Sequence, residues 1–517
     1  MAGYIGSKAV SVNTTSATIS DDLTVGDDAS VAGDLSVTGD YSSTTAGTSN
    51  LRLGVNAGNS IASGGNYNVT VGDEAGTAIT TGDNNVAVGM DALKATTTSS
   101  NNVAIGKGAL TANITGEKNV AIGSAALDAN TTGDKNVAVG NSALGSMNVT
   151  DGSETFNTAV GADAGKAVTT GVRNTLIGGL SGVAMTTGDR NVAVGATSLD
   201  ACTEGQYNVA VGNDALTTLT TGDKNTAVGI NAGAAITTGS KNTFIGSEAG
   251  DATTTASQNT AVGEAALSAN TTAVDNTAVG YLAGNANTTG AYNTFIGKDA
   301  GKTNVTGTLN SYIGEYSGRV ATGSNNTFLG QNSGSAITTG TKNTIIGRFG
   351  GNEGGLDMRG LSNHVILSDG DGNVRFKVIA NGVTFLPGVY NNTTAEAANV
   401  VAYSGGGGDM YRSTSALKYK QDIRDVEDFD INALRPVRYK SKCAIDDQTK
   451  DHLGIVADEA AEAGFEELVR RDAEGEVEGF QYERLTVVLL KSIQSLKAEL
   501  SATNDALAAR ITALEGA

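Results

Sequence analysis

A motif of the form N-x-x-[VIL]-G recurs eighteen times between residues 50 and 347, and it constrains the fold more than any other feature. Most copies are 17 residues apart, as in NVAVG at 85–89 and NTAVG at 225–229. Three residues after the motif glycine comes Ala, Ser or Gly, then Leu or Gly, and a turn such as TTGDK usually closes the unit. Units this short can bury apolar surface only against neighbouring copies, so this region is predicted to be a repetitive array.

Each repeat is predicted to form one β-coil. A unit of 17 residues is too short for a helical hairpin, and Thr, Val and Ile with Asn and Gly favour strands and turns. In NVAVG the two valines face one side and the third residue faces the other, while small residues such as Ala92 and Ala126 suit a crowded interior. The fifth-position Gly suits a turn or a close chain approach, and the Asn is expected to form a hydrogen-bonded ladder. Eighteen coils at about 4.8 Å each would form a shaft of about 90 Å.

The composition changes sharply at residue 413. Residues 1–412 hold 65 of the 70 glycines and 53 charged side chains, whereas residues 413–517 hold five glycines and 35 charges. Few aromatic residues and no Trp argue against large globular cores in the first part. The net charge of -20 argues against binding a nucleic-acid backbone. Cys202 and Cys443 lie far apart, so they indicate neither a disulfide framework nor a zinc site, and both are expected to be small buried residues.

The N-terminal region shows strand and turn patterns. The start MAGYIGSKAV lacks the apolar segment of a signal peptide, and no run approaches the length of a membrane span, so we expect synthesis in the cytoplasm. Gly-Asp pairs at 26–27, 33–34 and 39–40, with alternating Leu and Val between them, predict short strands joined by tight turns.

The repeats resemble the NxVAIG-type repeats of trimeric bacterial adhesin heads of the YadA type, which are parallel β-rolls, and similar repeats in bacteriophage tail fibres. The resemblance covers about 300 residues, with a longer period here. It implies a homotrimer, in which residues 1–49 would be a stalk with a virion-attachment tip. The repeats would be a stiff spacer, or some exposed positions would touch a receptor. Candidates for receptor contact are the third-position aromatic residues, because sugars and apolar epitopes favour aromatic platforms; burial against a neighbouring chain is the competing expectation for Phe244, Phe295, Tyr312 and Phe328.

Residues 350–412 are expected to form a distal β-hairpin region and a joint. Two alternating apolar runs in HVILSDGDGNVRFKVIANGVTF flank an Asp- and Gly-rich turn. Counted from Asp369, a calcium loop would need Gly at its sixth position and Glu at its twelfth, but the sequence has Val374 and Ala380 there. We therefore expect a plain hairpin turn and no metal. The GGGG run at 405–408 follows no strand-to-helix nucleotide motif and is interpreted as a flexible joint.

The last 105 residues carry several motifs in a recognisable order: STSALKYKQDI at 413–423, RPVRYK at 435–440, HLGIVADEA at 452–460 and QYERLTVVLLKSIQSL at 481–496. Together they resemble the intramolecular chaperone domain of endosialidases and tail fibres, the S74 family of self-cleaving peptidases. The resemblance implies that Ser415 is the nucleophile, that Lys420 is its partner and that the bond between Thr414 and Ser415 is cut. His452 could support this site or be structural.

The register of that assignment rests on the family pattern. Ala416 stands where the family often has Asp, Lys418 would give an S-x-x-K spacing, and Ser413 is a rival hydroxyl. The chemistry is consistent with these residue types, since a serine hydroxyl needs a base and a lysine becomes one when burial or nearby cations lower its pKa. With only two histidines in the chain, a Ser-His-Asp triad has little support.

The C-terminus is predicted to be a short coiled coil, with a helix packed on its own domain as the alternative. Ile493, Leu500, Leu507 and Leu514 recur every seven residues, and Leu489 and Leu496 occupy the adjoining seam position. Arg510 interrupts the second row.

The combined prediction is a mainly β, elongated trimeric solenoid fibre with a C-terminal α+β chaperone domain ending in a coiled-coil helix. Its expected parts are residues 1–49, 50–349, 350–412 and 413–517. The resemblance implies a structural tail fibre in the virion that attaches to a host surface glycan or outer-membrane protein, joins tail or adaptor proteins through its N-terminus and uses no cofactor. One alternative is a bacterial trimeric adhesin, which would need an export signal and an anchor. Another is a glycan-depolymerising tailspike, which would need paired carboxylates in a housing domain.

Overall fold

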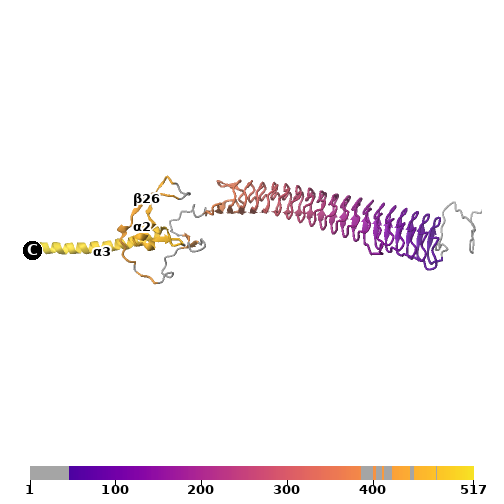
Figure 1. Ribbon diagram of the computed structural model, residues 1–517, viewed down its shortest axis with the longest axis horizontal. Coiled ribbons are helices and arrows are strands. Elements are labelled where there is room, and N and C mark those ends of the chain that lie inside the picture. Colours follow the sequence, from indigo (N-terminus) through magenta and orange to yellow (C-terminus); the bar gives the residue numbers. More distant parts are fainter. Residues whose placement is uncertain are drawn as a thin grey trace, which may run out of the picture. The chain divides into compact units, whose positions relative to one another are not determined.

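The computed structural model describes residues 46–385, 400–402, 410–412, 422–424, 426–442, 448–472 and 474–516. The chain divides into two compact units, 1–393 and 394–517, so the expected boundary at residue 349 falls inside the first unit. The first unit is a β-solenoid and the second combines short strands with helices (Figure 1). The mainly β solenoid predicted from the repeats is confirmed.

Each repeat contributes one three-residue strand, and the second to fourth residues of the motif form it. In chain order the strands are β1 (Leu51–Leu53), β2 (Val69–Val71), β3 (Val86–Val88), β4 (Val103–Ile105), β5 (Val120–Ile122), β6 (Val137–Val139), β7 (Thr158–Val160), β8 (Thr175–Ile177), β9 (Val192–Val194), β10 (Val209–Val211), β11 (Thr226–Val228), β12 (Thr243–Ile245), β13 (Thr260–Val262), β14 (Thr277–Val279), β15 (Thr294–Ile296), β16 (Ser311–Ile313), β17 (Thr327–Leu329) and β18 (Thr344–Ile346).

Equivalent strands stack in parallel and in register along the solenoid. Val86 pairs with Val103, for example, and Thr243 with Thr260. A nineteenth rung follows the eighteen motif copies, because β21 (Val365–Ser368) pairs in parallel with β18. The shaft therefore extends beyond the last motif copy, into the region expected to be a separate hairpin.

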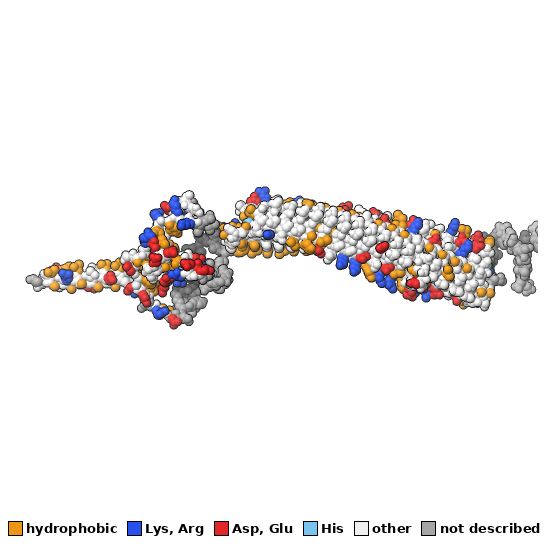
Figure 2. Space-filling view, viewed as in Figure 1, with side chains coloured by type: hydrophobic (Ala, Val, Ile, Leu, Met, Phe, Trp, Pro, Cys, Tyr) orange, Lys and Arg blue, Asp and Glu red, His pale blue; other side chains and the backbone are white. Residues whose placement is uncertain are grey.

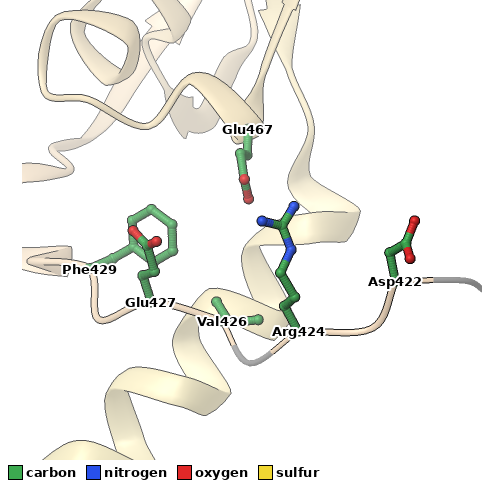
Figure 3. Close-up of a pocket in the computed structure, with 6 residues that line it drawn as sticks. All are labelled: Asp422, Arg424, Val426, Glu427, Phe429 and Glu467. Carbon is green, nitrogen blue, oxygen red and sulfur yellow. The ribbon is translucent and has the colours of Figure 1, made fainter.

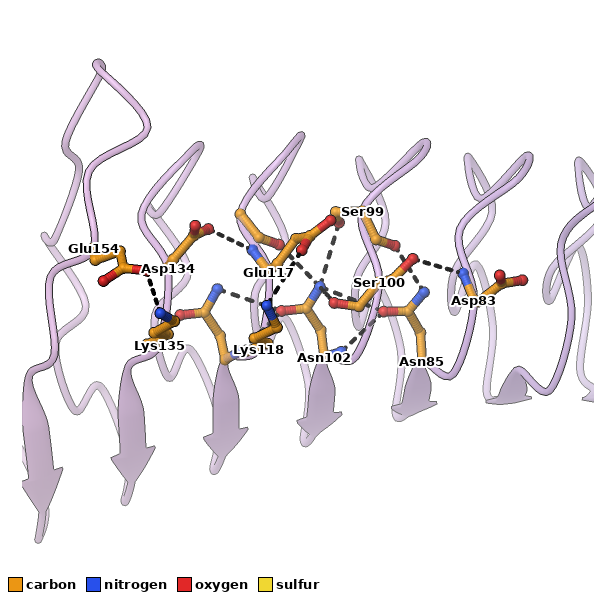
Figure 4. Close-up of polar contacts among 12 residues, drawn as sticks. Asp83, Asn85, Ser99, Ser100, Asn102, Glu117, Lys118, Asp134, Lys135 and Glu154 are labelled. Carbon is orange, nitrogen blue, oxygen red and sulfur yellow. Dashed lines mark hydrogen bonds and ion pairs between the residues drawn. The ribbon is translucent and has the colours of Figure 1, made fainter.

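Buried asparagines form the predicted ladder along one corner. The backbone N–H of Asn242 donates to Oδ1 of Asn225 at 3.0 Å, and its side-chain Nδ2 donates to the carbonyl of Ala256 at 2.9 Å. The same pattern joins Asn85 to Asn102 (Figure 4). Because each amide bridges neighbouring coils, the column satisfies polar groups that would otherwise be buried without partners. His364 replaces Asn in the last rung, where its backbone N–H donates to Oδ1 of Asn343 at 3.0 Å.

The motif glycines form a second column in which backbones lie against each other. Gly246 has φ 134°, and a Cβ atom there would lie 2.5 Å from the carbonyl oxygen of Gly263. Both the backbone conformation and the close approach exclude other residues, which confirms the role expected for the fifth position.

Volume is balanced between two interior columns. The third motif residue is buried in every coil after the first, and the residue six positions later, Leu or Gly, faces it. Leu occurs there only where the third residues of the same coil and the next are both Ala, as for Leu93 between Ala87 and Ala104. Wherever either is larger, the position is Gly; a Cβ at Gly233 or Gly250 would lie 2.8 or 2.5 Å from the ring of Phe244. The coils thus differ inside although their outlines match.

The C-terminal end of the solenoid carries short antiparallel strands. They are β19 (Asn352–Glu353), β20 (Leu356–Asp357), β22 (Val374–Val378) and β23 (Thr384–Phe385), and β22 pairs with β21 and β23. Phe349, Met358 and Ile366 are fully buried and belong to the solenoid core, so this segment covers apolar side chains of the last coils.

The second unit has a small core of its own. Its elements are β24 (Val400–Ala402), β25 (Met410–Arg412), η2 (Ile431–Ala433), β26 (Pro436–Lys440), β27 (Asp451–Ile455), α2 (Ala457–Glu462), η3 (Glu466–Leu468), β28 (Val469–Arg471), β29 (Val477–Phe480) and α3 (Tyr482–Glu515). β26 pairs with β27 and β28 with β29, both antiparallel. Ala460, Phe465, Leu468 and Val488 form the buried cluster, to which α3 contributes only its first turns.

Candidate functional site

The outer face of the strand stack is the most extensive candidate interaction surface. The fourth motif residue of every rung is Val, Ile or Leu and faces outward, and we call these nineteen side chains the aliphatic column. Ile245 and Ile346 leave 40% and 42% of their surface exposed. Hydrophobic side chains are visible along an edge of the shaft in Figure 2. The column consists of Leu53, Val71, Val88, Ile105, Ile122, Val139, Val160, Ile177, Val194, Val211, Val228, Ile245, Val262, Val279, Ile296, Ile313, Leu329, Ile346 and Leu367.

An uncharged aliphatic stripe of this length is unusual on a free surface. Nineteen rungs extend for about 90 Å, and contiguous exposed apolar patches of this size mark interaction sites. The signal was present in the motif, because its fourth position accepts only Val, Ile or Leu, whereas its third position varies from Ala to Phe. Sequence reasoning placed these residues on one face but did not recognise that the face is exposed.

The four aromatic residues proposed for receptor contact lie in the interior of the solenoid. Phe244, Phe295, Tyr312 and Phe328 are each 0% exposed. Tyr312 lies between two other rings, with centroid distances of 5.5 Å to Phe295 and 4.9 Å to Phe328, and burial raises the pKa of its hydroxyl. The expectation that these rings form a receptor platform is wrong, because the third motif position faces the core of its own chain. Burial against a neighbouring chain is excluded for the same reason.

The proposed cleavage residues lie outside the described residues. Thr414, Ser415 and Lys420 belong to the undescribed segment 413–421, and Cys443 lies in the undescribed segment 443–447. The assignment of Ser415 and Lys420 therefore stays a prediction.

His452 is held between the strands of the β26–β27 hairpin. It lies opposite Tyr439 in the register, and the two rings stack with centroids 5.6 Å apart. Its Nε2 atom is buried without a hydrogen-bond partner among the described residues. The ring is thus oriented by packing and keeps one nitrogen unused, which fits either role considered for it.

A polar pocket of about 370 Å³ lies in the second unit, and most of its lining residues follow the predicted cleavage segment in the sequence. It is lined by Asp422, Arg424, Val426, Glu427, Phe429 and Glu467. The side chains of Arg424 and Glu467 point toward one another across it (Figure 3). These residues offer one cation and several carboxylates, but no nucleophile.

The Asp- and Gly-rich segment forms the predicted hairpin turn between β21 and β22. Asp369 accepts hydrogen bonds from Asn373 and from Nε of Arg375 at 2.9 Å, and the Arg375 guanidinium lowers the pKa of Asp369 to about 2. Within the described ranges, no group of three or more His, Cys, Asp or Glu side chains is arranged to hold a metal ion. Cys202 is buried as predicted, and burial raises the pKa of its thiol to about 11.

The C-terminal helix α3 exposes its apolar side chains beyond the small core. Ile493, Leu496, Leu500, Leu507 and Leu514 are between 55% and 78% exposed. The helix itself is confirmed, and the seam predicted for a coiled coil lies on a single side of it, open to a partner.

Of the helices in the described ranges, none combines the length and the hydropathy needed to cross a bilayer. Comparison of the chain with models of protein families, with curated proteins and with solved structures gives no match.

Proposed function

We propose that this chain is the subunit of a homotrimeric phage tail fibre that attaches the virion to its host and carries a self-cleaving C-terminal chaperone. The aliphatic column is the observation that supports it most. A shaft of nineteen rungs serves reach and stiffness, and its unbroken apolar face is suited to association with further copies of the same shaft. Three parallel copies, each turning its column toward a common axis, would remove this face from water.

Burial of the aliphatic column would supply the free energy of association. Each partly exposed Val or Ile of the column would gain roughly 0.5–1 kcal/mol from burial. Summed over nineteen rungs, the gain is about 10–19 kcal/mol for each copy, which matches or exceeds the cost of about 4–15 kcal/mol for bringing copies together. Association therefore needs no strong single contact.

Alignment between copies is where a chaperone would act. Every rung presents the same kind of side chain, so sliding one copy by one rung preserves most contacts between shafts, and the misaligned states lie close in energy. The unique second unit, with the open seam of α3, would set the number and alignment of copies. Trimerisation through α3 would precede closure of the shaft.

Cleavage would then make the alignment permanent. The Ser415 hydroxyl, giving its proton to the Lys420 amine, would attack the carbonyl carbon of Thr414. The C–N bond to Ser415 would break as the leaving Ser415 amine takes up that proton, which leaves an ester between Thr414 and the Ser415 oxygen. Water would then hydrolyse the ester to the Thr414 carboxylate and the free Ser415 hydroxyl. Once the chaperone is cut off, the aligned fibre would persist because it unfolds slowly, even where misaligned states are similar in free energy.

Expression of the full chain tests this proposal directly. We expect a fragment ending at Thr414 and a second beginning at Ser415, identified by intact-mass analysis, whereas Ser415→Ala should keep one chain of 51.9 kDa. Ser413→Ala is the matched control and should still be cut. Light scattering should report three copies of the shaft. A folded wild-type assembly that stays uncut would overturn the cleavage step, and a monomeric shaft would overturn the trimer.

Attachment needs a separate assay. Labelled protein should bind cells of some strains in a bacterial panel and lose binding when surface glycans or outer-membrane proteins are removed. Sustained release of oligosaccharide from purified surface glycan would instead support a depolymerising tailspike.

A further inference from the structure

A second column on the solenoid consists of the residue that precedes each motif asparagine. In eight consecutive coils this residue is basic or aromatic, and we call these side chains the basic–aromatic ridge: Lys118, Lys135, Phe156, Arg173, Arg190, Tyr207, Lys224 and Lys241. The coils on either side have Asn101 and Gln258 at this position. All the ridge residues except the half-buried Lys135 are exposed.

The backbone presents the ridge side chains in a single row. Each residue adopts a left-handed conformation, with φ 58° at Lys118 and 62° at Lys241, so that the chain turns a corner there. Backbone N–H groups anchor the row, since Lys224 donates to the carbonyl of Gln206 at 3.0 Å and Lys241 to that of Asp223 at 2.9 Å. At about 4.8 Å per rung the eight residues extend for about 34 Å.

Much of the positive charge of the ridge is not neutralised by the chain. Among the described residues, Lys118 pairs with Glu117 at 3.9 Å and Lys135 with Glu154 (Figure 4), but no carboxylate lies within 4.0 Å of the charged nitrogens of the other four basic residues, Arg173, Arg190, Lys224 and Lys241. The nearest acidic side chains bond the main chain. Asp189 and Asp223 accept backbone N–H groups of the preceding coil at 2.8 and 2.7 Å, which fixes these carboxylates against the main chain.

The ridge residues follow a regular order of two basic side chains and one aromatic side chain. The Lys135 ammonium lies 5.1 Å from the centre of the Phe156 ring, and the Arg190 guanidinium lies 5.3 Å from that of Tyr207. The order returns every three rungs, about 14 Å. Exposed hydroxyl-bearing residues stand three positions before four of the ridge residues in the chain: Thr170, Thr187, Thr221 and Thr238.

We propose that the basic–aromatic ridge binds a linear acidic polysaccharide lying along the shaft. Guanidinium and ammonium groups pair with sugar carboxylates, aromatic rings contact the apolar faces of sugar rings, and the exposed threonine hydroxyls can bond sugar hydroxyls. A row that repeats at about one side chain per rung suits an extended polymer better than a compact ligand. The inference names the receptor class of the proposed attachment function and rests on that function for the source of the polymer.

A nucleic acid fits the surface less well. Its backbone carries one charge per about 1.7 Å of duplex and is bound by unopposed basic surfaces. Here the chain has a net charge of -20, and acidic side chains flank the row. A polymer with sparser charges and hydroxyl-rich rings avoids that repulsion.

Charge removal on the intact protein tests the ridge. The fourfold variant Arg173→Gln, Arg190→Gln, Lys224→Gln and Lys241→Gln removes the unpaired charges; Gln258 occupies the same position with φ 63°, so Gln is compatible with this backbone. The matched control Lys94→Gln, Lys166→Gln, Lys298→Gln and Lys302→Gln removes equal charge from other columns. Binding is measured with polygalacturonate, alginate and polysialic acid, and neutral dextran and duplex DNA serve as comparison polymers.

We expect the wild type and the control to bind at least one acidic polysaccharide more tightly than dextran and DNA, with affinity falling as salt rises. The ridge variant should bind at least about tenfold more weakly. Equal binding by both variants, tighter binding of DNA, or no preference over dextran would overturn the inference. If the wild type attaches to bacterial cells and the ridge variant attaches equally well, the ridge fails while host attachment stands. Absence of attachment by the wild type would instead count against the proposed function.

Discussion

At the scale of single residues, the motif glycines are the most restricted positions in the chain. Gly246→Ala would force a Cβ into the backbone of Gly263 in a conformation that suits only glycine. We expect a loss of roughly 3 kcal/mol or more in unfolding free energy. Gly108→Ala is the control, because Gly108 is also left-handed at φ 68° but has open space around it, so only about 1 kcal/mol should be lost. Chemical unfolding followed by circular dichroism measures both; equal losses would contradict the close-approach argument.

The asparagine ladder gives a second prediction at this scale. Asn242→Ala removes the acceptor of the Asn259 backbone N–H and the donor to the Ala256 carbonyl, and both groups are buried. The expected loss is about 2–4 kcal/mol, since two polar groups lose their partners. His364→Asn, which restores the column residue at the last rung, should change stability by less than about 1 kcal/mol. A tolerated Asn242→Ala, with an unchanged unfolding midpoint, would show that the ladder is dispensable.

Much of this residue-scale detail could be predicted from the sequence, because strict periodicity converts a local pattern into a column. The asparagine ladder, the glycine turns and the interior position of Ala92 and Ala126 were all predicted and are confirmed. The aromatic residues were not placed correctly. Alternation along a strand separates two faces, but it does not identify the face that meets the core.

At the scale of the coil, interior volume is shared between neighbouring elements. Phe244→Ala should open a cavity and cost about 3–5 kcal/mol, and Gly250→Leu should overpack the same space and cost about 1–3 kcal/mol. In the double variant, the introduced leucine would meet alanine at both third positions, the combination found at Leu93 and Leu267. We expect the double variant to be more stable than the sum of the single losses predicts, by about 1 kcal/mol or more in a double-mutant cycle. Strict additivity would mean that the two columns do not share space.

This volume rule is readable in the sequence once the solenoid is known. At the position six residues after the third motif residue, Leu and Gly follow no evident order along the chain. The order becomes clear when each is compared with the third residue of its own coil and of the next. Residues from adjacent repeats must first be placed side by side, which the linear sequence alone does not do.

At the scale of the whole molecule, the proposed association of copies depends on the aliphatic column and the helix seam. Ile245→Glu combined with Ile296→Glu places charges on the column, and we expect light scattering to report dissociation or misassembly of the shaft while the circular dichroism spectrum is retained. Ile230→Glu is the matched control, because Ile230 is 58% exposed but lies outside the strands. Equal effects of the two variants would mean that the column is not the interface.

The helix seam calls for a different readout. Leu496→Asp with Leu500→Asp should lower the yield of aligned assembly during expression, because both side chains are exposed on the seam and contribute nothing to the core of their own unit. Gln494→Asp with Ser501→Asp is the matched pair outside the seam. If both pairs assemble equally well, measured as the trimeric fraction in size-exclusion chromatography, α3 does not guide association.

The sequence predicts the fold of a single chain better than the way in which copies would assemble. Repeats determine contacts within one chain, so the solenoid, its rung spacing and the terminal helix were accessible. The nineteenth rung was missed because His364 stands where the motif has Asn, although its strand HVILS keeps the apolar alternation. The proposed contacts between copies would leave only an indirect trace, the restriction of one position to Val, Ile and Leu.

The strands of the solenoid run across its axis, and the backbone hydrogen bonds between coils run along it. A pull on the two ends therefore acts on successive rungs in series, so that each rung bears the entire force and the most weakly bonded rung yields first. Fraying under tension should begin at a terminal coil, because such a coil is bonded to a neighbour on one side only.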